Sequence, residues 1–386
     1  MPDTFTEVSS RSWFSRIGDS IKGIFFGFLL ILGAIVLLWW NEGRAIRRIK
    51  TLREGLQAVI PVSADSVDSA NAGKLVQMSG LATTTETLAD YEFGVSANAL
   101  KLERDAEMYQ WVETEKTHTQ KNLGGGTTTT KTYDYQQGWR SGRIDSNHFK
   151  HPEGHANPAI PYSPREFVAG KITVGAFTLS PELVVKINGH EALPVTSTDS
   201  LPAPLRATIQ LVDGKIYIGS NSASPVLGDE RVSFRVVKPV MVSLVAQQTG
   251  NTFKAYRSKV GGSVELLQVG EYSADQMFAH ARENNRLLTW GLRLLGWLLM
   301  YFGFRLLFAP LEVLADFIPI LGSIVGFGTG MLAFFLSAPL SLLVVAVAWI
   351  YYRPLFGIAL IAVAVAIPVL IHKQFKKKPP VTTSPA

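Results

Sequence analysis

The 386-residue chain contains no cysteine, which excludes disulfides, thiolate metal ligands and cysteine nucleophiles. It also lacks the G-x-S-x-G elbow of hydrolases, the H-E-x-x-H zinc helix and any paired-carboxylate spacing. Two glycine-rich stretches do not match a phosphate-binding or dinucleotide-binding motif. "LGGGTTTTK" (residues 123–131) has no glycine directly before its lysine, as a phosphate-binding loop requires, and "GFGTG" (residues 326–330) lies within an apolar segment. We therefore expect no catalytic residue, no cofactor and no enzymatic activity.

Charge is also absent from long stretches of the chain. Ile24 to Trp40 is a run of 17 uncharged residues. Together with Gly23 it covers roughly 27 Å as a helix, close to the ~30 Å hydrocarbon core of a bilayer. The run closes with Trp39 and Trp40 instead of a small-residue cleavage site. We interpret residues 24–40 as a retained membrane span.

The C-terminal third repeats this pattern. Leu287 to Leu311 is interrupted only by Arg293 and Arg305. These arginines lie near either end of a span at about 290–308, where long side chains reach opposite headgroup layers. An amphipathic helix lying in the membrane plane is the alternative.

Residues 317–352 carry no charge over 36 positions, about 54 Å as one helix. That is too long for one span and short for two spans with a turn. Pro319 and Pro339 favour a re-entrant first part and a span at about 330–350, with two spans left open. Residues 355–371 supply a last span before a basic tail. The spans then number four.

The middle of the chain is polar, with β-branched runs separated by glycine, proline and asparagine. Thr249-Gly250-Asn251 predicts a hairpin turn between two strands. The predicted fold is an α+β membrane protein with a four-helix transmembrane region and a large β-rich extracytoplasmic domain inserted between spans 1 and 2. Its predicted parts are a cytoplasmic segment 1–23, span 24–40, domain 41–286, membrane region 287–371 and cytoplasmic tail 372–386.

Basic residues beside the apolar runs predict orientation and lipid contact. An even number of spans puts the basic residues before the first span and after the last on one side, which we take as cytoplasmic. The β-rich domain then lies outside the cytoplasm. Residues expected at the lipid headgroups are Trp39, Trp40, Arg44, Arg47 and Arg48. Residues 41–60 are predicted to form an amphipathic surface helix or a plain continuation of the first span.

Glycine spacing predicts close helix packing. Gly322, Gly326 and Gly330 fall on one helical stripe, and Gly23 and Gly27 repeat the spacing in the first span. The stripes join spans of one chain or of two chains, and the spacing does not distinguish these.

A histidine cluster is the one candidate metal site. His148, His151 and His155 lie within eight residues, and three imidazoles can converge on zinc. Pro152 and Gly154 make this segment a turn, however, and the pattern identifies no carboxylate ligand. We expect no bound metal.

Several motifs together resemble one known family. "NEGRA", "EMYQWVET", "GHANP", "GDERVSF" and "DFIPILG" follow in the order found in the transmembrane protein 43 family, also called LUMA. The resemblance covers nearly the whole chain and implies four spans, a large domain after the first, and both termini in the cytoplasm. It also implies a role in membrane organisation and protein complexes, with no established catalytic residues.

Animal members of this family are found at the endoplasmic reticulum and inner nuclear membrane, and bacterial members exist. The short N-terminal segment and "NHFKHPEGH" depart from the animal pattern, which favours a bacterial inner membrane. We predict a multi-pass membrane scaffold whose partners are phospholipids, other membrane proteins or copies of itself, and no nucleic acid. The alternatives are a membrane-embedded lipid-modifying or hydrolytic enzyme, and a lipid-binding module.

Overall fold

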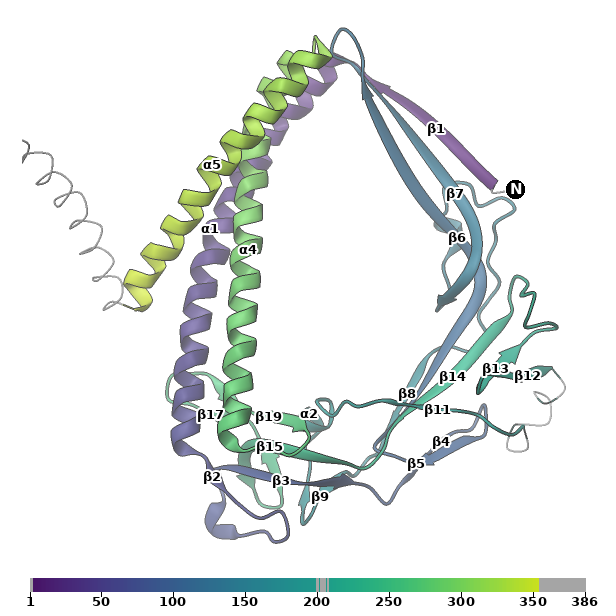
Figure 1. The fold of residues 1–386 in the computed structure, drawn as a ribbon, viewed down its shortest axis with the longest axis vertical. Coiled ribbons are helices and arrows are strands. Elements are labelled where there is room, and N and C mark those ends of the chain that lie inside the picture. Colours follow the sequence, from purple (N-terminus) through teal and green to yellow (C-terminus); the bar gives the residue numbers. More distant parts are fainter. Residues whose placement is uncertain (1–2, 199–200, 202–205, 207, 354–386) are drawn as a thin grey trace, which may run out of the picture. The chain divides into compact units, whose positions relative to one another are not determined.

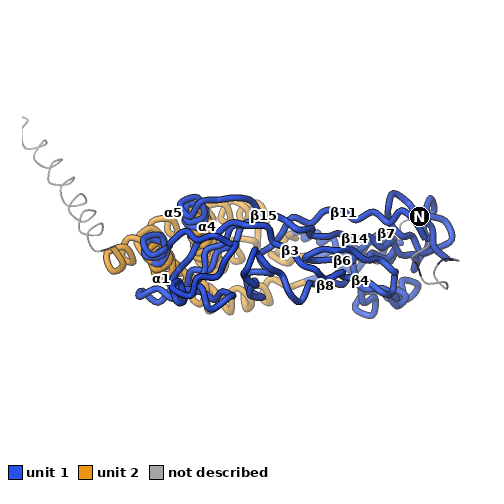
Figure 2. Tube along the Cα trace, turned by 90° about the horizontal axis from the view of Figure 1, so that it is seen from below, with its two compact units in different colours: residues 1–10, 51–120, 128–282 blue, residues 11–50, 121–127, 283–386 orange. Residues whose placement is uncertain are grey.

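The computed structural model describes residues 3–198, 201, 206 and 208–353. Contacts divide the chain into two compact units, which Figure 2 colours separately. The first, the domain unit, consists of residues 1–10, 51–120 and 128–282, and the second, the helical unit, of residues 11–50, 121–127 and 283–386. Neither unit is one continuous piece of sequence.

The larger sheet of the domain unit has eight strands. Their order is β1-β7-β6-β14-β13-β12, with β11 also paired to β14 and β8 to β6. β6 and β7 form a long hairpin of 21 and 15 residues (Figure 1). The strands are β1 (Asp3–Arg11), β6 (Lys101–Lys121), β7 (Thr127–Ser141), β8 (Arg165–Val168), β11 (Glu191–Leu193), β12 (Ile209–Val212), β13 (Lys215–Ile218) and β14 (Glu230–Val237).

A second sheet of seven strands has the order β10-β9-β3-β15-β16, with β19 paired to β15 and β2 to β3. The predicted turn at Thr249-Gly250-Asn251 is confirmed, because Thr249 pairs with Thr252 across it. The strands are β2 (Ile60–Pro61), β3 (Leu75–Thr83), β9 (Thr173–Val174), β10 (Phe177–Thr178), β15 (Val240–Thr249), β16 (Thr252–Lys254) and β19 (Leu266–Val269). Small ribbons pair β4 (Thr87–Asp90) with β5 (Val95–Asn98) and β17 (Tyr256–Arg257) with β18 (Ser263–Val264).

The domain core follows from the two-residue period of the strands. Ala106 and Met108 of β6 are fully buried, as are Val232 and Phe234 of β14. The register pairs Val232 with Ala106, so the buried residues of both strands lie on one face. That face forms the main apolar core.

The helical unit contains three long helices: α1 (Trp13–Ala58), α4 (Ala274–Ala315) and α5 (Pro319–Tyr352). Only the last turns of α1 and the first of α4 belong to the domain unit. With 46, 42 and 34 residues, they are about 69, 63 and 51 Å long. Each is long and apolar enough to cross a membrane. Only 17–22% of the most apolar stretch of each helix is buried inside the protein. The chain is therefore a membrane protein with large exposed apolar faces.

Glycines bring α1 and α4 into backbone contact. A Cβ built on Gly27 would lie 2.7 Å from the carbonyl oxygen of Gly303, and one built on Gly303 would lie 2.9 Å from that of Gly27. A side chain at either position would separate the helices. Close approach of this kind is how helices pack where no hydrophobic effect drives them together.

The predicted four-helix transmembrane region, with the domain inserted between spans 1 and 2, is wrong. The described residues hold three helices of sufficient length and apolarity, and the predicted span 355–371 lies outside the described residues. Strand β1 precedes α1 and joins the larger sheet, so the domain is more than an insertion after the first helix. Its nine residues carry too little apolar periodicity to be recognised as a strand without their partner β7.

Residues 317–352 also differ from expectation. One helix runs from Pro319 to Tyr352 in place of a re-entrant segment and a span. Pro319 occupies the first turn, where its missing N–H has no partner to lose, and Pro339 is accommodated inside the helix. Residues 41–58 continue α1, as in the second of the two alternatives for that segment.

Candidate functional site

A buried carboxylate joins the three helices of the helical unit. The Glu42 side chain is 1% exposed and accepts hydrogen bonds from Arg293 Nε at 2.7 Å and Nη2 at 2.9 Å. Trp349 Nε1 donates to the same carboxylate at 2.7 Å. The guanidinium group of Arg293 lies 4.7 Å from the ring centre of Trp290 and 5.5 Å from that of Trp349. This Glu42–Arg293–Trp349 cluster binds α1, α4 and α5 together.

Polar side chains extend this cluster along α1 and α4. Asn41 Nδ2 donates to the carbonyl oxygen of Thr289 at 3.0 Å. Arg44 donates to Asn285 Oδ1 and to Thr289 Oγ1, both at 3.0 Å. Arg44, expected at the lipid headgroups, thus holds two helices of its own chain together.

A second charged cluster fastens the hairpin tip, residues 121–127, to the helices. Asp316 has a fully buried side chain and accepts hydrogen bonds from Arg16 and, at 2.8 Å, from Lys121 Nζ. Lys121 also lies 3.0 Å from Glu312 Oε1. Burial by itself lowers the pKa of Lys121, but the hydrogen bonds to Asp316 and Glu312 outweigh it and raise the pKa above the usual value. We call this cluster the tip clasp.

Backbone groups complete the tip clasp. Gly124 N donates to the carbonyl oxygen of Phe317 at 3.1 Å, and Trp13 Nε1 donates to that of Val313 at 2.7 Å. The Trp13 ring lies against Gly125, where a Cβ would approach it to 2.3 Å. Gly125 has a φ of 79°, so glycine is required there for both conformation and space.

Arg293 and Arg305 were expected to reach opposite headgroup layers. The structure pairs both with protein groups instead: Arg293 with Glu42, and Arg305 with the carbonyl oxygen of Gly326 at 2.6 Å and Glu312 at 3.4 Å. A partly buried arginine beside a carboxylate avoids the cost of desolvating an unpaired charge.

An apolar groove runs between α4 and α5. It consists of two cavities of about 470 and 710 Å³ that share Trp297 and Phe334. Arg293 borders one cavity and Arg305 the other. The indole nitrogen of Trp297 is buried and has no hydrogen-bond partner among the described residues. The groove therefore combines apolar walls with one arginine beside each cavity.

Inside the domain unit, a charged group lies in the core. Arg104 is 3% exposed and donates to Asp90 at 2.8 Å and Glu92 at 2.5 Å. Glu230 is 1% exposed on the neighbouring strand β14. Burial raises its pKa to about 7, opposed by a backbone hydrogen bond from Tyr162 and by the charge of Arg104. Burial thus shifts the titration of the Glu230 carboxyl group towards neutral pH.

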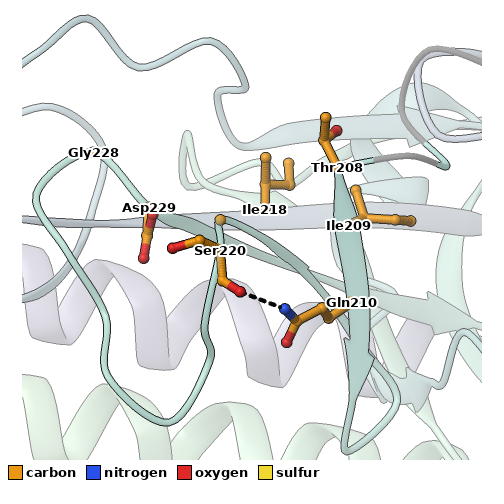
Figure 3. A pocket seen from close by; sticks show the side chains of 8 residues that line it. Thr208, Ile209, Gln210, Ile218, Ser220, Gly228 and Asp229 are labelled. Atoms are coloured by element: carbon orange, nitrogen blue, oxygen red, sulfur yellow. Dashed lines mark hydrogen bonds between the residues drawn. The ribbon is translucent and has the colours of Figure 1, made fainter.

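A shallow cavity of about 550 Å³ lies beside β12 and β13 (Figure 3). Its polar groups are already engaged: Gln210 Nε2 donates to the carbonyl oxygen of Ser220 at 2.9 Å. Asp229 accepts hydrogen bonds from Tyr217 Oη at 2.5 Å and from the Val226 amide at 2.9 Å. These hydrogen bonds to Asp229 stabilise the turn that precedes β14.

The three predicted histidines do not converge. The His155 side chain is 2% exposed, stacks on Tyr135 at 3.9 Å between ring centres and lies 3.1 Å from Asp3 Oδ2. His148 is 85% exposed. Within the described ranges, no group of three or more His, Asp or Glu residues is placed to hold a metal ion.

The predicted packing glycines lie against α4 of the same chain. The nearest side chains are Asp316 for Gly322, Glu312 for Gly326, Arg305 for Gly330 and Leu306 for Gly23. The stripe on α5 therefore makes room for charged side chains of α4 and of Asp316, the residue that follows α4.

The remaining predicted headgroup residues lie on one part of α1. Trp39 packs on Tyr351 and Tyr352, with ring centres 5.6 and 5.8 Å away. Trp40 and Arg47 are exposed, and Arg48 is half-buried. Trp40 and Arg47 thus face the surroundings of the protein, as lipid contact requires.

Sequence reasoning missed Glu42, Lys121 and Asp316 as functional side chains. Glu42 and Asp316 each adjoin a long apolar run, and an acidic residue in that position is costly unless it is paired. The cost of an unpaired acidic residue beside an apolar run could therefore have identified Glu42 and Asp316 from the sequence. No such signal marks Lys121, because it lies far from the helices in sequence.

Comparisons with known proteins place the chain in a family. The family model for Transmembrane protein 43 matches residues 108–354. The chain belongs to the transmembrane protein 43 family. It is 35% identical to Transmembrane protein 43 of Mus musculus over 95% of this chain and 94% of that protein. For the Homo sapiens protein the identity is 34% over 95% and 93%, and for the homolog of Drosophila melanogaster 31% over 87% and 90%. No solved structure matches.

Proposed function

We propose that this protein is a membrane scaffold, which holds protein partners or copies of itself at the bilayer through its β-rich domain. The observation that carries the proposal is the mutual pairing of charged groups in the helical unit. Glu42, Arg293 and Asp316 all join elements of the chain to one another. An enzyme needs polar groups free to meet a substrate in a pocket. Paired groups instead fix elements in place, which suits a structural role without enzymatic activity.

Phospholipids and membrane proteins are the partners that this proposal includes, and nucleic acid is not among them. Exposed tryptophan and arginine on α1, such as Trp40 and Arg47, support contact with headgroups. For the compartment we propose a bacterial inner membrane, supported by the departure of residues 147–155 from the pattern of animal members.

Site-specific photo-crosslinking in native membranes tests the scaffold. Tyr91 is 88% exposed in the domain unit, whereas Phe93, two residues away, is fully buried. A photoreactive phenylalanine analogue in place of Tyr91 should give a discrete product of higher mass, and one in place of Phe93 should give none. If exposed positions such as Tyr91 and Val185 give only monomer while the purified chain hydrolyses lipid esters, the protein is an enzyme instead.

A lipid-binding module is the second candidate, favoured by the groove between α4 and α5. Its apolar walls, which include Trp297 and Phe334, suit acyl chains. A bound lipid should copurify with the chain and be detected by mass spectrometry of an organic extract. Trp297→Phe should lower its amount, whereas Trp40→Phe, outside the groove, should not. Equal amounts from both variants would count against this candidate.

A further inference from the structure

The first strand of the domain unit is held in place with almost no apolar burial. β1 pairs with β7 at one edge of the larger sheet, where Figure 1 shows the two strands side by side. From Asp3 to Ser10 every residue is exposed except Glu7, which is half-buried. A strand that buries so little surface depends on its backbone ladder and on individual side-chain contacts.

The histidine-rich segment supplies these side-chain contacts. We call residues 148–155 the histidine loop; they belong to the domain unit, as do residues 3–10. Alternate side chains of a strand point to the same face of a sheet, and three alternate side chains of β1 meet this loop. The contacts are Asp3 Oδ2 with His155 Nε2 at 3.1 Å, Phe5 stacked on His151 with ring centres 5.5 Å apart, and Glu7 Oε2 with Lys150 Nζ at 2.8 Å.

His155 makes two polar contacts that a neutral imidazole cannot satisfy together. Its Nδ1 lies 2.9 Å from the carbonyl oxygen of His151, and its Nε2 lies 3.1 Å from Asp3 Oδ2. A carbonyl oxygen and an ionised carboxylate both accept hydrogen bonds and cannot donate. A neutral imidazole carries one N–H, whereas the imidazolium carries two. The geometry around His155 is therefore that of the protonated ring.

The surroundings of this ring suit a positive charge. The His155 side chain is only 2% exposed, so neighbouring groups must stabilise its charge in place of water. The ring stacks on Tyr135 with 3.9 Å between ring centres and meets Trp111 at 4.8 Å in a T-shaped arrangement. The face of an aromatic ring attracts a cation, and Asp3 supplies a negative charge.

Several titratable groups surround His155, and histidine is the kind that changes charge near neutral pH. Burial and the hydrogen bond to Glu113 raise the pKa of Tyr135 to about 12. The hydrogen bond to Glu7 raises the pKa of Lys150 above its usual value. Side-chain carboxyl groups ordinarily titrate near pH 4. The surrounding groups are Asp3 and Glu7 of β1, Glu113 and Glu115 of β6, Lys131, Tyr133 and Tyr135 of β7, and Lys150, His151 and Glu153 of the loop.

We propose that the histidine loop is a pH-sensitive latch for β1. When His155 is protonated, both of its N–H groups are bound, and Asp3 holds the start of the strand against the loop. When the proton is lost and the remaining one stays on Nδ1, Nε2 and the Asp3 carboxylate are two acceptors in contact, so this end of β1 is released. The latched state binds one proton more, and it is therefore favoured as the pH falls and lost as the pH rises through the range where histidine titrates. Release leaves β7 as an edge strand with unpaired backbone groups, the form in which a sheet accepts a strand from another protein.

Nitroxide mobility on β1 tests the latch, because the full-length chain has no cysteine and a label attaches only where one is introduced. Thr4 is exposed on β1, and Lys254 is exposed on β16 of the other sheet. Spectra of Thr4→Cys and Lys254→Cys in detergent are compared at about pH 5.5 and about pH 8, on either side of the ordinary histidine pKa of ~6.5. At Thr4 the ratio of mobile to immobile label should rise about tenfold, the effect of losing one charge-assisted hydrogen bond, and at Lys254 it should not change. An unchanged ratio at Thr4, or an equal rise at Lys254, would overturn the proposal.

Carboxylate variants separate the latch from general attachment of the strand. Asp3→Asn places an amide there, which donates to a neutral imidazole and accepts from a protonated one, so the ratio at Thr4 should be the same at both pH values. Glu7→Gln removes the other carboxylate of β1, and the pH response should remain. The Asp3 side chain is 67% exposed, so its variant should fold. A pH response that persists in Asp3→Asn would refute the latch.

Histidine variants identify the ring that titrates. His155→Phe keeps a ring to stack on Tyr135 but has no proton to lose, so the label should be mobile at both pH values. His151→Phe keeps the stack with Phe5 and should respond to pH as the unaltered chain does. If His155→Phe does not fold, Asp3→Asn decides the matter. A response kept in His155→Phe and lost in His151→Phe would assign the switch to the other ring and contradict the proposal.

Discussion

Among single residues, Glu230 should control how the stability of the domain depends on pH. Its pKa of about 7 in the folded state lies above the ordinary 4.5, so the folded state binds the proton more tightly. The contribution of Glu230 to stability is then fully present at or below pH 4.5 and is lost as the pH rises through 7, by up to about 3 kcal/mol. Glu230→Gln should abolish this fall in urea unfolding followed by tryptophan fluorescence. The exposed control Glu191→Gln should keep it, and a fall that persists in Glu230→Gln would refute the assignment.

The ion pair of Glu42 with Arg293 is a second residue-scale determinant. Arg293→Met leaves a buried carboxylate unpaired, which should cost about 3–5 kcal/mol. Adding Glu42→Gln removes the stranded charge and should restore part of the loss. Thermal unfolding in detergent measures both variants, with the exposed Arg47→Met as a control near wild type. Equal stability of the single and double variants would show that the two side chains are not coupled.

At the scale of elements, the contact between α1 and α4 depends on Gly303. Ala is the better helix former by about 1 kcal/mol, so a glycine in open space should tolerate it. Gly291 of the same helix has nothing within 4 Å of a built Cβ, whereas Gly303 meets the backbone of α1. Gly291→Ala should leave the melting temperature unchanged or raised, and Gly303→Ala should lower it. Similar melting temperatures for the two variants would show that the helices are free to move apart.

The local sequence predicted some helices and strands and missed others. The apolar runs from Ile24 and Leu287 identified α1 and α4, because a long uncharged stretch has few other stable forms. β1 was missed, since a nine-residue strand at a sheet edge gains its stability from β7. Pro319 and Pro339 suggested a broken segment, but Pro319 occupies the first turn, where it costs no hydrogen bond, and the helix continues through Pro339.

For the whole molecule, the glycine stripe of α5 bears on oligomeric state. Gly326 lies against Glu312 of its own chain, whereas the Cβ of a residue at Gly328 would meet nothing within 4 Å. Gly326→Leu should lower the melting temperature by forcing α4 and α5 apart, and Gly328→Leu should leave it unchanged. Light scattering coupled to size-exclusion chromatography measures the molecular mass of each variant. A stable Gly326→Leu variant that has merely become monomeric would instead assign the stripe to an interface between copies.

The sequence by itself determined that this is a membrane protein with a β-rich domain and identified its family, since apolar runs and short motifs are local features. The spacing of His148, His151 and His155 predicted a turn, and the absence of a bound metal there stays a prediction. Only the tertiary structure decided that Lys121 meets Asp316, that Arg293 meets Glu42, and that β1 returns the N-terminus to the domain. Each of these joins residues more than a hundred positions apart. The energy of such a pair depends on distance and burial in the folded chain, which no local pattern of residues records.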